Sequence, residues 1–180
     1  MNLRIAPTLL LSLLLLSSAG AAESPALLRL PNFDSLTERA SESVNITLDS
    51  TLLGLAARFL DAEDPEDAAA KDVIRGLTGI YVRSFTFEED FAYPRTDIDT
   101  LRKQLSAPGW QRLVEVRSRK EQAHVDIYIS ILGEKANGLA IIASEPREFT
   151  IVNIVGSIDL EKLHKLEGQF GIPKLELEKD

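Results

Sequence analysis

Polar side chains capable of chemistry alternate along one predicted strand, residues 123–132. They are His124, Asp126, Tyr128 and Ser130, and they face away from Val125, Ile127, Ile129 and Ile131. Histidine, aspartate and serine are the residue types of a hydrolase triad. Alternate residues of a strand, however, project in parallel about 6.6 Å apart, whereas a nucleophile and its base must approach within about 3 Å. The chain also lacks a Gly-x-Ser-x-Gly motif. We therefore assign no catalytic residue and predict a solvated sheet face.

Arg83 and Arg117 are the next residues of interest, because each lies among apolar residues in a β-rich segment. The planar guanidinium group of arginine suits carboxylates and is frequent at interfaces. If both project on an open sheet face near Asp126 and Tyr128, they form a polar binding patch. The alternative is pairing within the chain, for example with Asp126 or Glu115. The predicted binding residues are therefore Arg83, Arg117, Asp126 and Tyr128.

Metal and cofactor motifs are missing from the sequence. His124 and His164 are the two histidines, and no His-Glu-x-x-His pattern occurs. The acidic run at residues 61–67 lacks the spacing of a calcium loop, and Asp64-Pro65 suits the start of a helix. Phosphate loops and dinucleotide fingerprints are absent. With no cysteine, disulfides and cysteine–metal sites are excluded. We predict no metal and no cofactor.

Residues 1–22 have the order of a secretory signal peptide. Arg4 gives a positive start, an apolar run covers residues 5–16, and small residues end at Ala21 and Ala22. The apolar run is about a dozen residues, and a membrane-spanning helix needs about 20. We expect cleavage after Ala21 or Ala22, no integral membrane anchor, and export to the periplasm or outside the cell.

The charge of the chain limits its partners. The 20 Lys and Arg residues stand against 28 Asp and Glu residues, and loss of Arg4 with the signal peptide changes the net charge from −8 to −9. An acidic chain without a basic stripe repels phosphate backbones, so we predict no nucleic-acid partner. Cleavage after Ala21 leaves 159 residues, which suits a lead-in at residues 23–30 and one domain at residues 31–180.

The hydrophobic pattern predicts an α+β fold. Helices are expected at residues 31–40, 51–60, from Pro65 to Gly76 or Gly79, at 97–107 and from Asp159 onward. Strands are expected at residues 43–49, 80–87, 110–118, 123–132, 139–144 and 149–156. The last four strands are joined by turns that are too short for parallel crossovers. We predict a single, mainly antiparallel sheet of five to six strands with helices packed on one face. The positions of the first two strands stay open.

Two finer expectations concern burial. The helix at residues 51–60 is expected to bury Leu52, Leu55, Ala56 and Phe59, which share one helical face. Asn153 lies within an apolar strand, where satisfying neighbouring backbone is favoured over binding a partner.

Several segments together resemble one bacterial family. They are Leu30-Pro31-Asn32-Phe33, residues 79–85, Pro108-Gly109-Trp110, Val116-Arg117-Ser118, residues 138–146, residues 151–156 and Ile158-Asp159-Leu160. In this order they resemble the family called domain of unknown function 4252. The resemblance implies a bacterial, exported, single-domain protein with a link to envelope regulation. It implies no reaction and no catalytic residue.

Three functions remain open from the sequence. The leading hypothesis is a non-enzymatic periplasmic protein that binds an envelope protein or a small ligand through its sheet. The first alternative is a periplasmic hydrolase that uses His124, Asp126 or Ser130. The second is a structural envelope component that assembles through an edge strand, such as residues 44–48, or through the tail. The sequence leaves the oligomeric state open.

Overall fold

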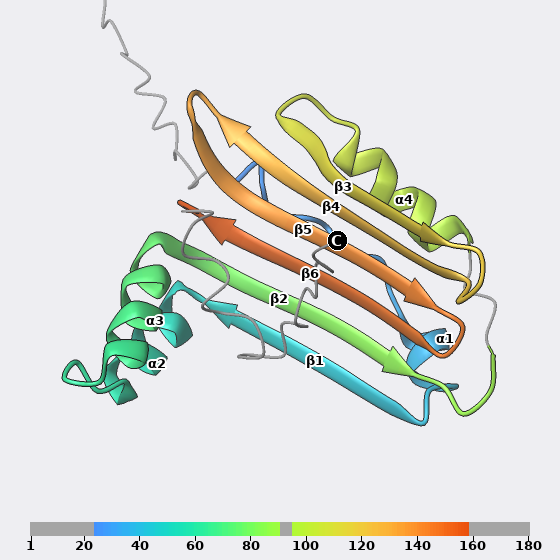
Figure 1. Cartoon of the computed structure of the whole chain (residues 1–180), viewed down its shortest axis with the longest axis horizontal. Helices are drawn as coiled ribbons and strands as arrows, with labels where there is room; N and C mark the ends of the chain where they lie inside the picture. The colour runs from blue at the N-terminus through green and yellow to red at the C-terminus, as the bar shows by residue number, and fades with distance from the viewer. Residues whose placement is uncertain (1–23, 91–94, 159–180) are drawn as a thin grey trace, which may run out of the picture.

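The computed structural model describes residues 24–90 and 95–158. They form one six-stranded antiparallel sheet in the order β1-β2-β6-β5-β4-β3 (Figure 1). The strands are β1 (Glu42–Asp49), β2 (Leu77–Thr86), β3 (Trp110–Ser118), β4 (Ala123–Leu132), β5 (Lys135–Glu145) and β6 (Glu148–Gly156). The predicted α+β class with a single antiparallel sheet is confirmed. The predicted signal peptide, the helix from Asp159 and the tail lie outside the described residues.

Short turns determine three of the five strand pairings. β3, β4, β5 and β6 follow one another as a meander, because their connections allow only antiparallel neighbours. The open question of the first two strands is resolved by two further pairings: β1 pairs with β2, and β2 pairs with β6. The edges of the sheet are therefore β1 and β3. The prediction of an edge strand at residues 44–48 is confirmed in position.

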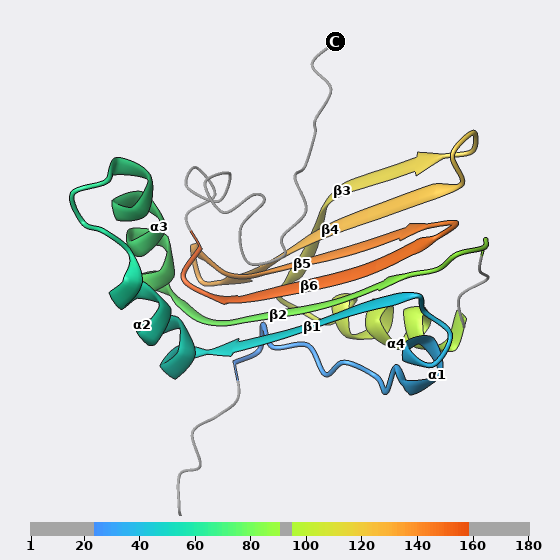
Figure 2. The ribbon, with the colours of Figure 1, turned by 90° about the horizontal axis from the view of Figure 1, so that it is seen from below.

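The helices occupy two places around the sheet. They are α1 (Asp34–Thr37), α2 (Ser50–Phe59), α3 (Pro65–Gly76) and α4 (Arg95–Leu105). α1, α4 and the chain that leads into α1 lie on one face, while α2 and α3 stand at the end of the sheet beside β1 and β2 (Figure 2). The α3 start follows the expected pattern, since the Asp67 backbone N–H donates to Asp64 Oδ1 at 3.1 Å.

Each face of the sheet has its own hydrophobic core. On the face of α1 and α4, Phe149 and Ile151 of β6 pack with Leu101 of α4 and with Phe33 beside α1. On the opposite face, Val152 and Ile154 pack with residues of α2 and α3. The central strands therefore bury both faces, as their long apolar runs require.

The prediction of a solvated face on β4 is wrong. Asp126, Ser130 and Tyr128 are only 1%, 2% and 9% exposed. The polar residues of β4 lie on the face that α4 covers, as the packing of Tyr128 with Leu101 and Leu105 shows. Polar side chains on this face must find partners inside the protein, because burial without them costs free energy.

The predicted buried face of α2 is also wrong. Leu52, Leu55 and Phe59 are 44%, 48% and 82% exposed, whereas Leu53 is 1% exposed. Ala57 and Leu60 pack on the same core as Leu53. Apolar residues occupy both sides of this helix, so periodicity does not decide which side faces inward. The position of α2 at the end of the sheet determines which side faces the core.

Asn153 hydrogen-bonds the segment from Ala26 to Leu28 to the sheet. Its Oδ1 accepts from the Leu28 N–H at 2.9 Å, and its Nδ2 donates to the Ala26 carbonyl at 3.0 Å and the Leu139 carbonyl at 3.2 Å. A Cβ atom at Gly138 would collide with Ala26, so glycine allows this close crossing. The preferred interpretation of Asn153, backbone satisfaction, agrees with these contacts.

Candidate functional site

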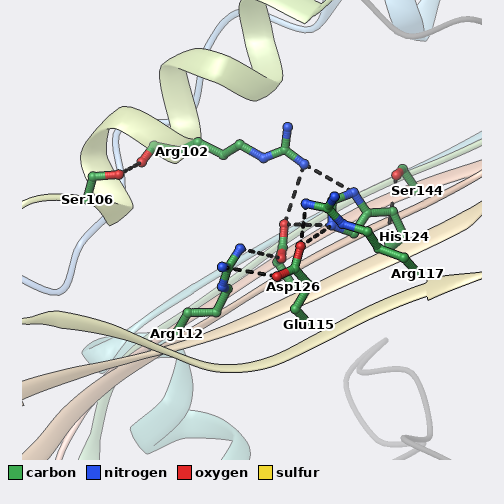
Figure 3. A network of polar contacts seen from close by, with 8 residues as sticks. All are labelled: Arg102, Ser106, Arg112, Glu115, Arg117, His124, Asp126 and Ser144. Atoms are coloured by element: carbon green, nitrogen blue, oxygen red, sulfur yellow. Dashed lines mark hydrogen bonds and ion pairs between the residues drawn. The ribbon is translucent and has the colours of Figure 1, made fainter.

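A group of charged side chains, here called the edge cluster, lies where α4 covers β3 and β4 (Figure 3). Its members are Arg102, Arg112, Glu115, Arg117, His124 and Asp126. Arg102 comes from α4, Arg112, Glu115 and Arg117 from β3, and His124 and Asp126 from β4. Pairing of Glu115 with Asp126 and of Arg117 with His124 brings the two strands' contributions together.

A β-bulge is essential for this arrangement. The register of β3 against β4 shifts between Arg112 and Val114. In a regular strand, Arg112 and Glu115 would face opposite sides, because they are an odd number of residues apart. The bulge places them on the same side, and Arg112 Nη2 lies 3.0 Å from Glu115 Oε2.

Asp126 is the buried centre of the edge cluster, with a side chain that is 2% exposed. Arg102 Nη2 lies 3.5 Å from its Oδ2, and Arg112 Nη1 lies 3.6 Å from its Oδ1. His124 Nε2 lies 3.3 Å from Oδ2. The guanidinium groups of Arg102 and Arg112 thus balance a carboxylate that would otherwise be costly to bury.

Glu115 connects the buried centre to the surface. Its carboxylate pairs with Arg117 as well as with Arg112. The side chain of Arg117 is 67% exposed, compared with 45% for Arg112 and 39% for Arg102. Charge therefore becomes more accessible from Asp126 outward to Arg117. Pairing of Arg117 with Glu115 is one of the two intramolecular alternatives that the sequence left open.

Both ring nitrogens of His124 face charged neighbours. Arg102 Nη2 lies 3.2 Å from Nδ1. Arginine has only donors, so Nδ1 accepts and the neutral ring carries its proton on Nε2, beside Asp126. No imidazole nitrogen is left to activate a nucleophile. Within the described residues, Ser130 makes no hydrogen bond to His124, and Ser144 Oγ approaches only the His124 backbone carbonyl, at 3.4 Å.

Three atoms of the edge cluster have the spacing of metal ligands. One ligand atom each from Glu115, His124 and Asp126 lies within 4.8 Å of the others. His124 Nε2 and Asp126 Oδ1 are buried without a hydrogen bond. Three arginines surround these atoms, however, and repel a cation. The contact from Arg102 to Nδ1 also keeps the proton on Nε2, the nitrogen that a metal would need.

Tyr128 adjoins the edge cluster and shares its electrostatics. Burial raises the pKa of Tyr128, and the charge of Asp126 raises it further. Arg112 and Arg102 act in the opposite direction and lower the same pKa. The phenol is therefore neutral at physiological pH, and its ring serves as core beside Leu101.

Arg83 lies in another part of the sheet, so the single patch predicted from Arg83, Arg117, Asp126 and Tyr128 is not present. Arg83 shares a row across the sheet with Asp126, but β6 and β5 separate their strands. Three strand spacings correspond to about 14 Å. Arg83 and Arg117 project from the same face of the sheet, but only Arg117 belongs to the edge cluster.

Sequence reasoning missed Arg102 and Arg112. Nothing in the sequence indicates that Arg102, on a helix, would reach β4. Arg112 was missed because its facing depends on the bulge. Glu115 was already named from the sequence as a possible partner within the chain, given its place in the predicted strand of residues 110–118.

Comparison with family models decides the relationship that the segments suggested. Residues 37–166 match the model described as Domain of unknown function (DUF4252). The chain belongs to the DUF4252 family. The match includes every residue of the edge cluster and Arg83, and it begins within α1. Comparisons with curated proteins and with solved structures gave no match. Among residues 24–90 and 95–158, no helix has the length and apolarity needed to cross a membrane.

Proposed function

We propose that this member of the DUF4252 family is an exported, non-enzymatic interaction module that binds an acidic envelope protein through the edge cluster. The observation that carries the proposal is an excess of positive charge. Three arginines surround two carboxylates, so the edge cluster has one more positive than negative charge while His124 is neutral. On a chain of net charge −8, this is a local attraction for carboxylates.

The arginines are also held in position for binding. Asp126 is buried and contacts Arg102 and Arg112, while Glu115 contacts Arg112 and Arg117. Side chains that are ordered before binding lose less conformational entropy when a partner arrives. Their partly exposed guanidinium groups keep donors available, since each has five N–H bonds in a planar fork.

Site-specific photo-crosslinking in the bacterial envelope tests this proposal. A photoreactive residue replaces Leu113, which is half exposed on β3 beside the edge cluster. A second version carries it at Leu52 on α2, at the other end of the sheet. We expect an acidic protein to be captured from Leu113 only, and capture to decrease with rising salt because exposed charges are screened.

Matched arginine variants make the test specific. The double variant Arg112→Ala/Arg117→Ala is expected to lose the crosslinked protein. Arg75→Ala is the control, because Arg75 is an exposed arginine of α3 that pairs with Asp72. Capture of the same proteins from the wild type and the double variant would show that the edge cluster has no role in binding. Circular dichroism of both variants is the check that they fold.

Assembly through an edge strand is the second candidate, and one observation favours it: β1 is an edge of the sheet. Edge strands present unpaired backbone groups to other strands. Size-exclusion chromatography with light scattering distinguishes it from the first candidate. We expect a monomer if the edge cluster is the main interaction site, and oligomers lost on Ile46→Pro if β1 mediates assembly.

A further inference from the structure

Among the residues that the structure describes, Arg83 has no carboxylate partner. Its Nη1 donates to the Val82 carbonyl at 2.8 Å and to the Ile46 carbonyl at 3.1 Å, while Nη2 lies 3.5 Å from Thr47 Oγ1. Within residues 24–90 and 95–158, no acidic side chain forms an ion pair with it. The hydrogen bonds orient the guanidinium group, but neutral carbonyls do not balance its charge.

The surroundings of Arg83 make this missing partner significant. The side chain is partly buried, and burial lowers the pKa of its guanidinium group. Arginine nevertheless stays protonated in proteins, so a positive charge persists there. Partly buried charges are normally paired, because leaving them unpaired costs free energy. A ligand with a negative charge would supply the counter-ion that the described chain does not.

A groove next to Arg83 has room for such a ligand. The cavity is about 340 Å³ and lies between the α1 region and strands β1 and β2. Phe33 and Phe85 line it, and their ring centroids are 5.6 Å apart. Both residues are buried, at 6% and 2% exposure, and contribute an apolar part of the lining. Asn45 of β1 adds a polar side chain at the wall.

A charge of opposite sign lies on the other wall. Asp34 at the start of α1 lines the same groove and is exposed. Asn32 Nδ2 donates to Asp34 Oδ2 at 2.8 Å, and Asn32 Oδ1 accepts from the Asp34 N–H at 2.8 Å. These contacts hold the carboxylate in place without neutralising it. Asp34 and Arg83 line the same groove without an ion pair between them, so the groove offers one anion, one cation and an apolar surface.

We propose that this groove binds a small zwitterion of the amino-acid or dipeptide class. The ligand's carboxylate pairs with Arg83, its ammonium group pairs with Asp34, and its apolar side chain contacts Phe33 and Phe85. The volume fits this class, because it lies at the lower end of the range of about 300–1,000 Å³ that is typical of ligand sites. Binding here is independent of partner docking at the edge cluster, since the two sites share no residue.

Nuclear magnetic resonance titration of the mature chain with leucyl-leucine tests the proposal. We expect the backbone amide resonances of residues 43–45 and of Arg83 to shift. The C-terminal amide of leucyl-leucine lacks the carboxylate, and N-acetyl-leucyl-leucine lacks the ammonium group. Each is expected to bind at least about tenfold more weakly, because each loses a charge-assisted contact.

Matched variants assign the charges to residues. Arg83→Met and Asp34→Asn are each expected to weaken leucyl-leucine binding about tenfold or more. Arg58→Met, an exposed arginine of α2 at the other end of the sheet, is expected to bind as the wild type does. Asp34→Asn changes an exposed side chain only, so it keeps the test valid even if Arg83→Met does not fold.

Three results would overturn the inference. The first is the absence of shifts at residues 43–45 with millimolar leucyl-leucine, leucine, glutamate and lysine. The second is equal affinity of Arg83→Met and the wild type. The third is equal affinity for the acetylated and free dipeptides, which would show that Asp34 binds no ammonium group and that the ligand is not a zwitterion.

Discussion

The edge cluster and the Arg83 groove occupy the same face of one sheet but balance their charges in opposite ways. In the edge cluster, three arginines meet two carboxylates from neighbouring strands. At the groove, Arg83 contacts backbone carbonyls and the hydroxyl of Thr47. The edge cluster thus balances most of its charge within the chain, while at the groove no described residue supplies a counter-ion for Arg83.

This difference separates contributions to stability from contributions to binding. When a charge is balanced by a buried partner inside the protein, removing that partner destabilises the fold, because the remaining charge is left uncompensated. A partly buried charge that lacks a partner carries a desolvation cost, which a ligand can offset. Substitutions in the edge cluster should therefore destabilise the protein, whereas substitutions at Arg83 should affect ligand binding more than folding.

The largest effect is expected from Asp126→Ala. This change leaves Arg102 and Arg112 without their buried carboxylate, and we expect a loss of about 3 kcal/mol in the free energy of unfolding. Asp90→Ala is the matched control: Asp90 pairs with Arg147, but both side chains are mostly exposed. The control should lose less than about 1 kcal/mol. Urea unfolding measures both, and equal losses would show that Asp126 is not the electrostatic centre.

Asn153→Ala should have the next largest effect and should act on the groove only. It leaves the Leu28 N–H and the Ala26 carbonyl without their side-chain partner, at a cost of about 2 kcal/mol. Because the chain from Ala26 leads to Phe33, we expect faster hydrogen exchange in residues 26–33. Exchange in β3 and β4 should stay as in the wild type. Uniformly faster exchange would mean that Asn153 supports the whole sheet. Gln111→Ala, an exposed position, is the control.

The contrast also shows what the sequence could and could not predict. The bounds of β3 and β4 were predicted correctly, because alternation and short turns are local signals. The pair of Arg117 with Glu115 was one of two alternatives that the sequence left open. The edge cluster as a whole depends on the bulge at Arg112 and on the packing of α4 over β4, and neither is a local property.

Burial was the other limit of sequence reasoning. The polar face of β4 looked solvated because alternation shows which residues share a side, and does not show what covers that side. The same reason explains α2, where Leu53 faces the core and Phe59 faces solvent. The separation of Arg83 from Arg117 required the strand order, which depended on where β1 and β2 joined the meander.

The pH dependence of the free energy of unfolding at alkaline pH should depend on Tyr128, which adjoins the edge cluster. Burial, then the charge of Asp126, raises the pKa of this phenol above its ordinary value of 10.0. Above pH 10 the folded state then holds more protons than the unfolded state, so stability must fall as the pH rises. The free energy of unfolding of Tyr128→Phe, measured with urea, should decrease less steeply between pH 10 and pH 11 than that of the wild type. An unchanged slope would mean that this phenol does not couple to folding.

The smallest expected effect is a difference between the stability changes caused by replacing Arg102 and by replacing Arg83. Arg102→Met removes a contact to buried Asp126, so we expect a loss of about 1 kcal/mol. Arg83→Met removes a partly buried charge that has no carboxylate partner in the described part of the chain, and methionine keeps much of the apolar stem. Its Nη1 hydrogen bonds go to the neutral backbone carbonyls of Ile46 and Val82. We therefore expect no loss, or a gain of up to about 0.5 kcal/mol. Urea unfolding of the two variants in parallel measures both changes in the free energy of unfolding. A loss for Arg83→Met as large as the loss for Arg102→Met would mean that both arginines stabilise the fold. The groove would then have no unbalanced charge for a ligand to neutralise.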